Sequence, residues 1–440
     1  MATGSLNLLN LLRIKSRVVS RERKKVCLIT PNHISTNPRL VKEAVALDKN
    51  GFDVHLIFTQ SDYFETGLDQ AILSQYPNWT YDALDWSGKD LHSKIFRSLF
   101  GLSKKLAEVS FYSLTLKKVA PFVVNRNFFW QLQKAISANA DLYIGHNLGA
   151  LPVARTAAKK TGAKFGFDAE DFHRNEMADN TTDKDVLIKT SVEEQNFPGL
   201  HHFTAASPLI ANAYKKLFPT LDPTVILNVF PKTKLSTQNR EAGENIRLFW
   251  FSQTLGDNRG IEVIVQAMGK TRQRVFELHL LGNSSPGYKE KIGQLALTSG
   301  VNNQLFFYDP VPENEIFQLA SKCDIGMASE TGIPYNRDIC LTNKIFTYIQ
   351  SGLAVVASDT TAQKEFIGNY PSAGKVYSRS DSASLASILD YYVDNREELE
   401  ASKHSNHHLG QTFMNWETEQ EKYIDCIRML FPAHKELSVC

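Results

Sequence analysis

Short apolar runs alternate with amphipathic segments along most of the chain. Runs rich in β-branched and aromatic residues predict strands in the first half at 25–30, 52–58, 140–146, 164–170, 201–207 and 224–229. The rhythm restarts in the second half, with strands predicted at 246–252, 277–282, 304–309, 324–329 and 354–359. Between them lie helix-like segments such as residues 38–51, where apolar positions recur at helical spacing. Apolar strands that alternate with helices predict parallel sheets covered on both faces.

A polar stretch at 231–245 divides this pattern into two halves. It contains proline and glycine and shows no periodicity, so it is the predicted linker. We therefore expect two doubly wound α/β domains, at 25–230 and 246–412. A basic segment, 1–24, precedes them, and residues 413–440 include a helix-like part that could cross back to the first domain. A ligand of such a fold binds at the carboxyl ends of the strands, here where the domains face each other.

The composition is that of an ordinary globular protein, with 440 residues, 42% of them apolar and 22% charged. No run approaches the roughly 18 uninterrupted apolar residues that a membrane span needs. The first 25 residues lack the charge order and cleavage site of a signal peptide. The five cysteines form no CxxC pair, and no His/Cys cluster has zinc spacing. These features predict a cytoplasmic protein with reduced thiols and no metal.

The net charge of +2 hides an uneven distribution. Residues 1–25 hold seven Lys or Arg and one acidic residue, and residues 87–135 hold nine and two. Such a basic surplus suits an anionic partner, either nucleic acid or a lipid surface. Residues 94–118 combine lysines and an arginine with many leucines and aromatics, as does a helix that lies in an anionic membrane interface. This pattern favours peripheral membrane association over nucleic acid, with a packed helix and solvated basic face as the alternative.

The stretch FWFSQTLGDNRGIEVIVQAM (249–268) reads as a buried strand, a loop and an amphipathic helix that starts near Gly260. Arg259 stands at the helix threshold, where backbone N–H groups already attract anions. A full positive charge beside those amides suits a diphosphate. The alternative is a solvated residue at a helix start. GxGxxG is absent, so dinucleotide binding is not supported.

A second cation stands at a helix start in the segment 329–360. Thr342 is a suitable N-cap, and Asn343 and Lys344 fall in the first turn, where a lysine opposes the helix dipole. A second phosphate or ribose contact would explain this placement, and a surface lysine is the alternative.

Polar residues also follow the strands of the first half. His33 and Asn37 lie on the loop after the first strand, where they would line the cleft or, alternatively, belong to an ordinary capped helix. The other candidates for binding hydroxyls or taking a proton follow two later strands and are His146, Asp168, Glu170, Asp171 and His173. A structural role is the alternative for each of them.

These stretches together resemble a retaining glycosyltransferase of the GT-B fold, close to glycosyltransferase family 4. The resemblance covers roughly residues 25–430. It rests on NPR at 37–39, on SQTLGDNRG at 252–260 and on NKIFTYIQSGLAVVASDT at 343–360. It implies two Rossmann-like doubly wound domains that face a central cleft, with the nucleotide sugar held mainly by the second.

The resemblance assigns site residues on both sides of the cleft. Arg259 and Lys344 match the basic residues that contact the donor diphosphate, and Glu330 is a candidate for the donor sugar. Gln253 stands where a second basic residue is common, and Thr347 where the family has a second glutamate. The donor site is thus assigned to Gln253, Arg259, Gly260, Asn343, Lys344 and Thr347. Catalysis is assigned to Arg259, Lys344, Glu330 and Asp171. On the acceptor side, Glu170 and Asp171 stand where the family often has a His-Glu pair. Together with the residues already noted after the strands, the predicted acceptor-binding set is His33, Asn37, His146, Glu170 and His173.

The implied reaction is transfer of a hexosyl unit from a nucleotide diphosphate sugar to a hydroxyl group, with retained anomeric configuration. The acceptor would be a glycan or lipid-linked glycan in polysaccharide biosynthesis, with no cofactor. One alternative is a nucleotide-sugar 2-epimerase of the same fold, which needs no acceptor. Another is a non-enzymatic sugar- or nucleic-acid-binding protein.

Overall fold

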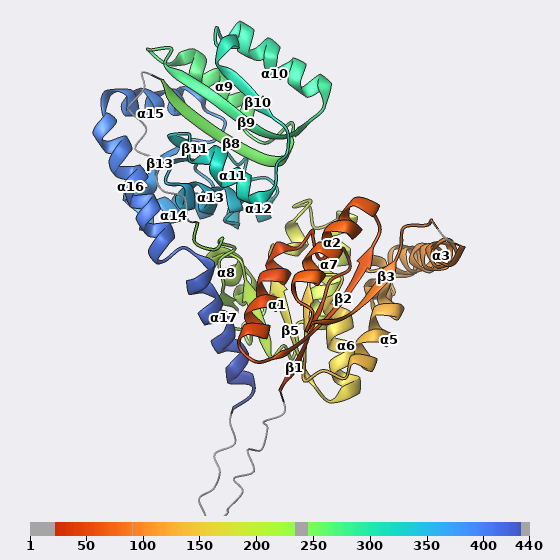
Figure 1. Cartoon of the computed structure of the whole chain (residues 1–440). Helices are drawn as coiled ribbons and strands as arrows, with labels where there is room; N and C mark the ends of the chain where they lie inside the picture. Colours follow the sequence, from red (N-terminus) through yellow and green to blue (C-terminus); the bar gives the residue numbers. More distant parts are fainter. Residues whose placement is uncertain (1–22, 90, 234–244, 433–440) are drawn as a thin grey trace, which may run out of the picture.

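The computed structural model describes residues 23–89, 91–233 and 245–432. The predicted basic segment 1–24 and linker 231–245 therefore lie almost wholly outside the described residues. Two lobes, each built on a parallel sheet, meet at a narrow waist (Figure 1). The prediction of two doubly wound domains in the GT-B arrangement is confirmed.

The first lobe contains a seven-stranded sheet in the order β3-β2-β1-β4-β5-β6-β7. Its strands are β1 (Lys25–Ile29), β2 (Asp53–Gln60), β3 (Thr80–Asp85), β4 (Leu142–His146), β5 (Lys164–Ala169), β6 (His202–Ala205) and β7 (Thr224–Val225). Its helices are α1 (Pro38–Lys49), α2 (Tyr63–Gln75), α3 (Leu91–Leu114), α4 (Ala120–Val124), α5 (Phe128–Ala138), α6 (Leu151–Thr161), α7 (Lys184–Asn196) and α8 (Pro208–Leu217).

The second lobe contains a six-stranded sheet in the order β10-β9-β8-β11-β12-β13. Its strands are β8 (Ile246–Leu255), β9 (Phe276–Ser284), β10 (Leu305–Tyr308), β11 (Ile325–Ala328), β12 (Ala354–Ser358) and β13 (Gly374–Tyr377). Its helices are α9 (Ile261–Lys270), α10 (Pro286–Thr298), α11 (Glu313–Ala320), α12 (Tyr335–Ile339), α13 (Asn343–Ser351), α14 (Thr361–Asn369), α15 (Ser382–Asp394) and α16 (Arg396–Thr412). A last helix, α17 (Trp416–Leu430), follows.

Alternating side chains along the central strands build a core on each face of each sheet. In β1, Cys27 and Ile29 pack with α5 and α6, whereas Val26 and Leu28 pack with α1. All four are fully buried. This is why the strand is apolar throughout, as expected for a parallel sheet with two covered faces.

The strand predictions differ from the structure at the sheet edges and at one loop. The edge strands β3 and β13 were not predicted, because half-exposed strands of mixed polarity lack a continuous apolar run. β7 ends at Val225, short of the predicted 229. β8 continues to Leu255 through a register shift after Phe251, so Gln253 lies on a strand and not in the predicted loop.

The chain returns to the first lobe at its C-terminal end. α16 lies beside the second sheet, and α17 runs down beside α1 and α8 (Figure 1). Tyr423, Ile424 and Ile427 of α17 enter the same apolar core as Leu40 of α1. The Glu419 carboxylate accepts a hydrogen bond of 2.9 Å from the backbone N–H of Leu227.

A buried ion pair ties α1 to the centre of the first sheet. The Arg39 guanidinium donates to both carboxylate oxygens of Asp168, at 2.6 and 2.8 Å, and to the carbonyl oxygen of Ile226 at 2.7 Å. Thr204 donates a further hydrogen bond to Asp168. Arg39 and Asp168 are 1% and 0% exposed, so the interaction takes place away from water. A buried pair is tolerable only when its polar atoms are satisfied in this way.

We expect Arg39→Met to lower the free energy of unfolding by about 3–5 kcal/mol, because it leaves the Asp168 carboxylate buried without its counter-charge. Urea unfolding measures the change. Lys24→Met is the control, since the Lys24–Asp141 pair is largely exposed and should contribute about 1 kcal/mol or less. Equal losses in the two variants would contradict the structural role of Arg39.

Candidate functional site

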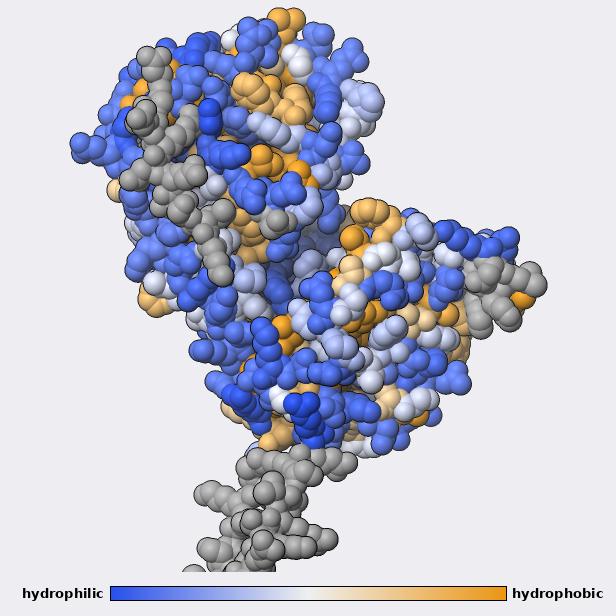
Figure 2. All heavy atoms as spheres, in the orientation of Figure 1, coloured by the Kyte–Doolittle hydropathy of each residue, from blue (hydrophilic) through white to orange (hydrophobic). Residues whose placement is uncertain are grey.

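In each sheet the chain adds strands first on one side of its first strand and then on the other. At this switch point the loops that follow the two adjacent strands lead away from each other. In the second lobe this point lies between β8 and β11, and in the first between β1 and β4. Ligands of doubly wound folds bind in the crevice at such points, beyond the carboxyl ends of the strands. The molecule is hollowed between the two lobes, and the surface there is mainly hydrophilic (Figure 2).

A glycine brings the start of α9 against the end of β11. Gly260 has φ of 79°, a left-handed conformation, and a Cβ at this position would lie 2.7 Å from the Ser329 Cβ. Any other residue would therefore be strained and would collide with the neighbouring loop. The α9 N-terminus, with its unpaired N–H groups, is thus kept close to the residues after β11.

Arg259, directly before this glycine, has no ion-pair partner among the residues that the structure describes. Its Nη1 donates to the Ser252 Oγ at 3.0 Å, and the residue is half-buried. Its charge is therefore available to a ligand at the α9 N-terminus.

Lys344 and Glu330 form a close ion pair next to this loop. The Lys344 Nζ lies 2.5 Å from the Glu330 Oε1, and their side chains are 11% and 8% exposed. The ammonium group also lies 5.2 Å from the centre of the Trp250 ring. Trp250 donates to the Ser329 Oγ, which in turn donates to the Arg259 carbonyl oxygen. The structure therefore brings Arg259, Glu330 and Lys344 to one place.

Trp250 and Ser329 join these groups, and neither was predicted from the sequence. Trp250 reads as an ordinary core residue, and only the position of Ser329 directly after β11 hints at a site.

The remaining donor-side residues are less clearly placed for binding. Gln253 and Asn343 are exposed, whereas Thr347 is 1% exposed and its hydroxyl has no hydrogen-bond partner. Thr342 occupies the N-cap of α13, but its side chain makes no capping hydrogen bond, contrary to the sequence prediction. The Thr342 hydroxyl is buried without a partner.

On the first lobe, the loop after β1 carries two predicted residues that have partners within the fold. The Nδ1 of His33 lies 2.7 Å from an Asp69 carboxylate oxygen, and its Nε2 accepts a hydrogen bond from the Ser61 N–H. Asn37 caps α1 by accepting from the Leu40 N–H. Both side chains are buried. These contacts favour structural roles for His33 and Asn37.

His146, Asp168 and Glu170 form the only His/Cys/Asp/Glu group among the described residues whose atoms lie close enough to hold a metal ion. Arg39 and Thr204 already occupy the Asp168 oxygens, so a guanidinium stands where a cation would be needed. The pattern fits a buried ion network better than a metal centre, and the absence of a metal stays a prediction.

Two groups in this network have shifted pKa values. Burial raises the pKa of Glu170, and the neighbouring Asp168 carboxylate adds to the effect, to about 7. Burial alone would lower the pKa of His146, but the nearby Glu43 carboxylate outweighs it and the net shift is upward. Glu170 is therefore able to exchange a proton near neutral pH.

Asp171 and His173 lie where the lobes touch. The side chain of Asn336, from α12, accepts a hydrogen bond from the Phe172 N–H and donates one to Asp171, each at 2.7 Å. The His173 Nδ1 lies 3.2 Å from a Glu176 oxygen. Asn336 was not predicted, because nothing in its local sequence marks a contact with the other domain.

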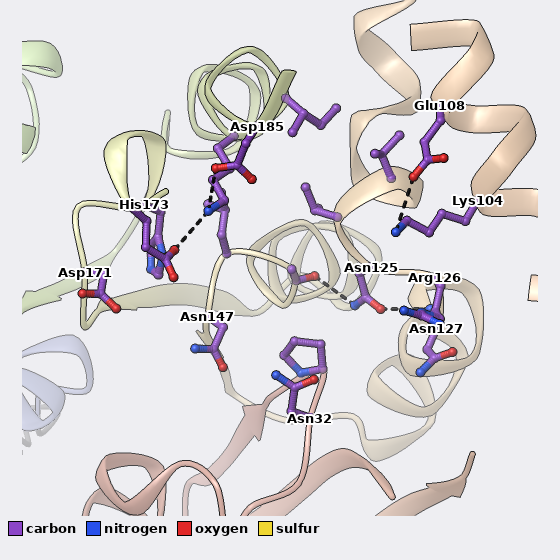
Figure 3. Close-up of a pocket in the computed structure, with 18 of the residues that line it drawn as sticks. Asn32, Lys104, Glu108, Asn125, Arg126, Asn127, Asn147, Asp171, His173 and Asp185 are labelled. Atoms are coloured by element: carbon purple, nitrogen blue, oxygen red, sulfur yellow. Dashed lines mark hydrogen bonds and ion pairs between the residues drawn. The ribbon is translucent and has the colours of Figure 1, made fainter. Parts of the chain in front are cut away.

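A cavity of about 570 Å³ opens beside Asp171 and His173, at the switch point between β1 and β4. Loops after these strands supply Asn32 and Asn147, and α3, α4 and α7 supply further walls (Figure 3). Polar and charged residues that line it include Asn32, Lys104, Glu108, Asn125, Arg126, Asn127, Asn147, Asp171, His173, Glu176, Asp185 and Lys189. Of these, only Asp171 and His173 were predicted as site residues.

Two facing lobes with clustered cations at one switch point and a polar cavity at the other define a GT-B protein. Residues 246–395 match the family described as glycosyl transferases group 1. The second lobe thus matches this group of glycosyltransferases over almost its whole length. The resemblance stated from the motifs is confirmed. No curated protein matches the chain in sequence.

Several solved structures share the fold along almost the whole chain. Alr3699/HepE from Anabaena, in complex with UDP and glucose, is 16% identical with a TM-score of 0.67, over 92% of this chain and 100% of that chain. Sucrose-phosphate synthase from Thermosynechococcus elongatus is 14% identical with a TM-score of 0.65, over 93% and 99%. The lipopolysaccharide glycosyltransferase WaaG is 13% identical with a TM-score of 0.58, over 92% and 99%.

We expect Glu170 to make stability fall as pH rises. Its folded pKa of about 7 lies above the ordinary value of 4.5, so the native state holds the proton more tightly. The resulting stabilisation is complete below about pH 4.5 and is lost as pH rises through 7. Glu170→Gln should remove this loss and be more stable than the parent at pH 8, by on the order of 2 kcal/mol. Urea unfolding at pH 4.5 and 8 measures it. An equal difference in unfolding free energy between Glu170→Gln and the parent at both pH values would count against a raised pKa of Glu170.

Proposed function

We propose that the chain transfers a hexosyl unit from a nucleotide diphosphate sugar, held by the second lobe, to a hydroxyl of an acceptor held by the first. The observation that carries this proposal is the grouping of Arg259, Glu330 and Lys344 at the switch point between β8 and β11. HepE was solved with UDP and with UDP-glucose, which makes UDP-hexoses the first donors to test.

The donor diphosphate would lie against the α9 N-terminus and the Arg259 guanidinium. Glu330 neutralises the charge of Lys344, so a bound diphosphate would pair with the ammonium group in its place and release the carboxylate. A freed Glu330 is then suited to accept hydrogen bonds from hydroxyls of the donor sugar. Gln253, Asn343 and Thr347 complete the proposed donor site.

Retention of configuration is the proposed stereochemical course. The leaving phosphate would itself help to deprotonate the acceptor, while Arg259 and Lys344 stabilise its growing charge. Glu170 and Asp171 follow strand β5 of the first lobe and are the proposed acceptor-side groups. His146 and His173 of the same lobe complete this proposed set. The anomeric configuration of the product, read by NMR, tests this course. Formation of a C2 epimer from the donor alone would instead support the epimerase alternative.

The proposed acceptor is a glycan or lipid-linked glycan at an anionic membrane surface. No helix among the described residues is long and apolar enough to cross a bilayer. The exposed side of α3, however, carries a stripe of large apolar residues that are 48–60% exposed, namely Ile95, Leu99, Leu102, Leu106 and Val109. Their spacing of four and three residues places them on one face. Exposed lysines at 94 and 105 border it, as suits anionic headgroups.

Lys104, which also belongs to the basic segment 94–118, lies on a different side of α3. It lies two residues from both Leu102 and Leu106, about 200° around the helix from each. It lines the cavity instead, 3.4 Å from Glu108. Lys104 and Lys105 are therefore neighbours in sequence that serve different surfaces.

We expect Arg259→Ala to lower kcat by about 10²- to 10³-fold and to change the donor KM less, because its charge matters most when the leaving group becomes anionic. The donor is the UDP-hexose that raises the melting temperature of the protein most. The rate of UDP release from that donor, measured over a range of donor concentrations, gives both kcat and KM. Arg259→Lys should recover part of the rate, since a point charge cannot bridge two oxygens. Arg272→Ala is the control, as Arg272 is bound to Asp390 and Asp394 on the surface. Normal turnover of folded Arg259→Ala would remove the assignment.

We expect Lys105→Glu to weaken binding to anionic vesicles by at least about fivefold, because each basic residue near such a surface contributes roughly 1 kcal/mol. Lys104→Glu, one residue away but facing the cavity, should change it much less. Sedimentation with anionic and neutral vesicles at low and high salt measures the effect. Equal effects of the two substitutions, or equal binding to neutral vesicles, would argue against the docking face.

A further inference from the structure

Charge is distributed unevenly along the cavity of the first lobe. The end beside the second lobe holds Asp171, Glu176 and Asp185, with Lys189 paired to the latter two. The opposite end holds Lys104 and Arg126, with Glu108 as its acidic residue (Figure 3). A ligand that fills the cavity would therefore meet excess negative charge near the lobe junction and excess positive charge at the far end.

Arg126 is the strongest unpaired charge at the far end. It is exposed on the turn between α4 and α5, and no described residue forms an ion pair with it. Its guanidinium lies 5.7 Å from the centre of the Trp86 ring. An aromatic face thus partly orients the guanidinium, but no described acidic residue neutralises its charge.

The turn that carries Arg126 is fixed by its two neighbours. The side-chain amide of Asn125 donates to the Gly149 carbonyl and to Gln131, and its oxygen accepts from the Asn127 N–H. The Asn127 amide donates to the Thr59 hydroxyl. Both asparagines are buried. This network fixes the backbone on both sides of Arg126 and so holds the arginine at the rim of the cavity. A surface arginine with no binding role would not need such a fixed backbone.

The cavity also contains groups suited to hydroxyls. The side-chain oxygen of Asn127 and the Nε2 of His173 are buried without a partner, although both residues line the cavity. An unpaired buried polar group is costly, and both atoms belong to residues of the cavity wall, where a ligand would supply the missing partners. Asn32 and Asn147 add two amides, which both donate and accept, as sugar hydroxyls do.

The face of α3 that lines the cavity lies opposite the apolar stripe. Lys104, Glu108 and Tyr112 are spaced by four residues and all border the cavity. A single helix, about 10 Å across with its side chains, therefore separates the positive end from the proposed membrane surface.

We propose that this cavity binds the acceptor as a sugar bearing an acidic group, with the acid at Arg126 and Lys104 and the reacting hydroxyl at Asp171. This inference rests on the proposed function, because it names the chemical class of the acceptor. A phosphate or phosphodiester on the sugar provides the shared chemistry. Its source is either a lipid-anchored glycosyl phosphate or a free sugar phosphate.

The test compares two small probes on the full chain saturated with UDP, namely α-D-glucose 1-phosphate and its neutral counterpart methyl α-D-glucoside. Titration calorimetry or ligand-observed NMR gives both affinities. We expect the phosphate to bind at least about tenfold tighter, as for one charge-assisted contact in a partly desolvated site. Arg126→Gln should remove most of that advantage and leave the weaker affinity for methyl glucoside unchanged.

Lys118→Gln is the matched control, since Lys118 is also exposed and near α3 but does not line the cavity. It should keep the full advantage of the phosphate. Equal affinities of the parent protein for the two probes, or an advantage that survives in Arg126→Gln, would overturn the proposal. UDP binding by the Arg126→Gln protein separates this outcome from failure of the proposed function, since the donor site lies on the other lobe.

A second arm identifies the source of the acid. The same glucosyl phosphate is presented on a diacyl lipid in zwitterionic vesicles and compared with the free probe. Tighter binding of the anchored form, lost in Leu102→Ser/Leu106→Ser, identifies a lipid-linked acceptor. Equal binding of both forms identifies a free sugar phosphate, and either result supports the acidic acceptor.

Discussion

The architecture of the first lobe depends on the buried pairing of Arg39 with Asp168. It joins the first helix to the fifth strand and, through the Ile226 carbonyl, to the segment that leads toward the second lobe. The planar guanidinium satisfies both carboxylate oxygens and a carbonyl at once, which a lysine could not do. The same contact places a guanidinium on the Asp168 oxygens that a metal ion at His146, Asp168 and Glu170 would need. Burial, with the Asp168 carboxylate beside it, raises the pKa of Glu170.

The proposed reaction would be divided between two switch points with different chemistry. The second lobe offers a helix N-terminus, an arginine without an ion-pair partner among the described residues, and a lysine that is paired with Glu330. The first lobe offers a larger polar cavity with amides at its walls and opposite charges at its ends. Asn336 bridges the two by binding the backbone of Phe172 and the side chain of Asp171. The geometry around Asp171, on the proposed acceptor side, therefore depends on the position of the second lobe.

Much of the fold was visible in the sequence, and so were several residues of the proposed donor site. The alternation of apolar strands with helices is a local pattern, and so it predicted both sheets, apart from the half-exposed edge strands β3 and β13. Arg259 and Gly260 were predicted as donor-site residues because a helix start, a glycine and a cation are adjacent in the chain. Lys344 was predicted from another local feature, since a lysine in the first turn of a helix is unfavourable.

What only the tertiary structure decided are the pairings between residues distant in the chain. The ion pair of Lys344 with Glu330, the His33–Asp69 contact and the bridge from Asn336 to Asp171 join separate loops. Lys104 and Lys105 show the limit most clearly, because they are identical in type and adjacent in sequence. The sequence determined that both lie on one amphipathic helix, but only the packing of that helix against the lobe decided which lysine faces the cavity. Composition and periodicity describe one segment at a time, whereas a side chain's environment is set by whatever packs against it.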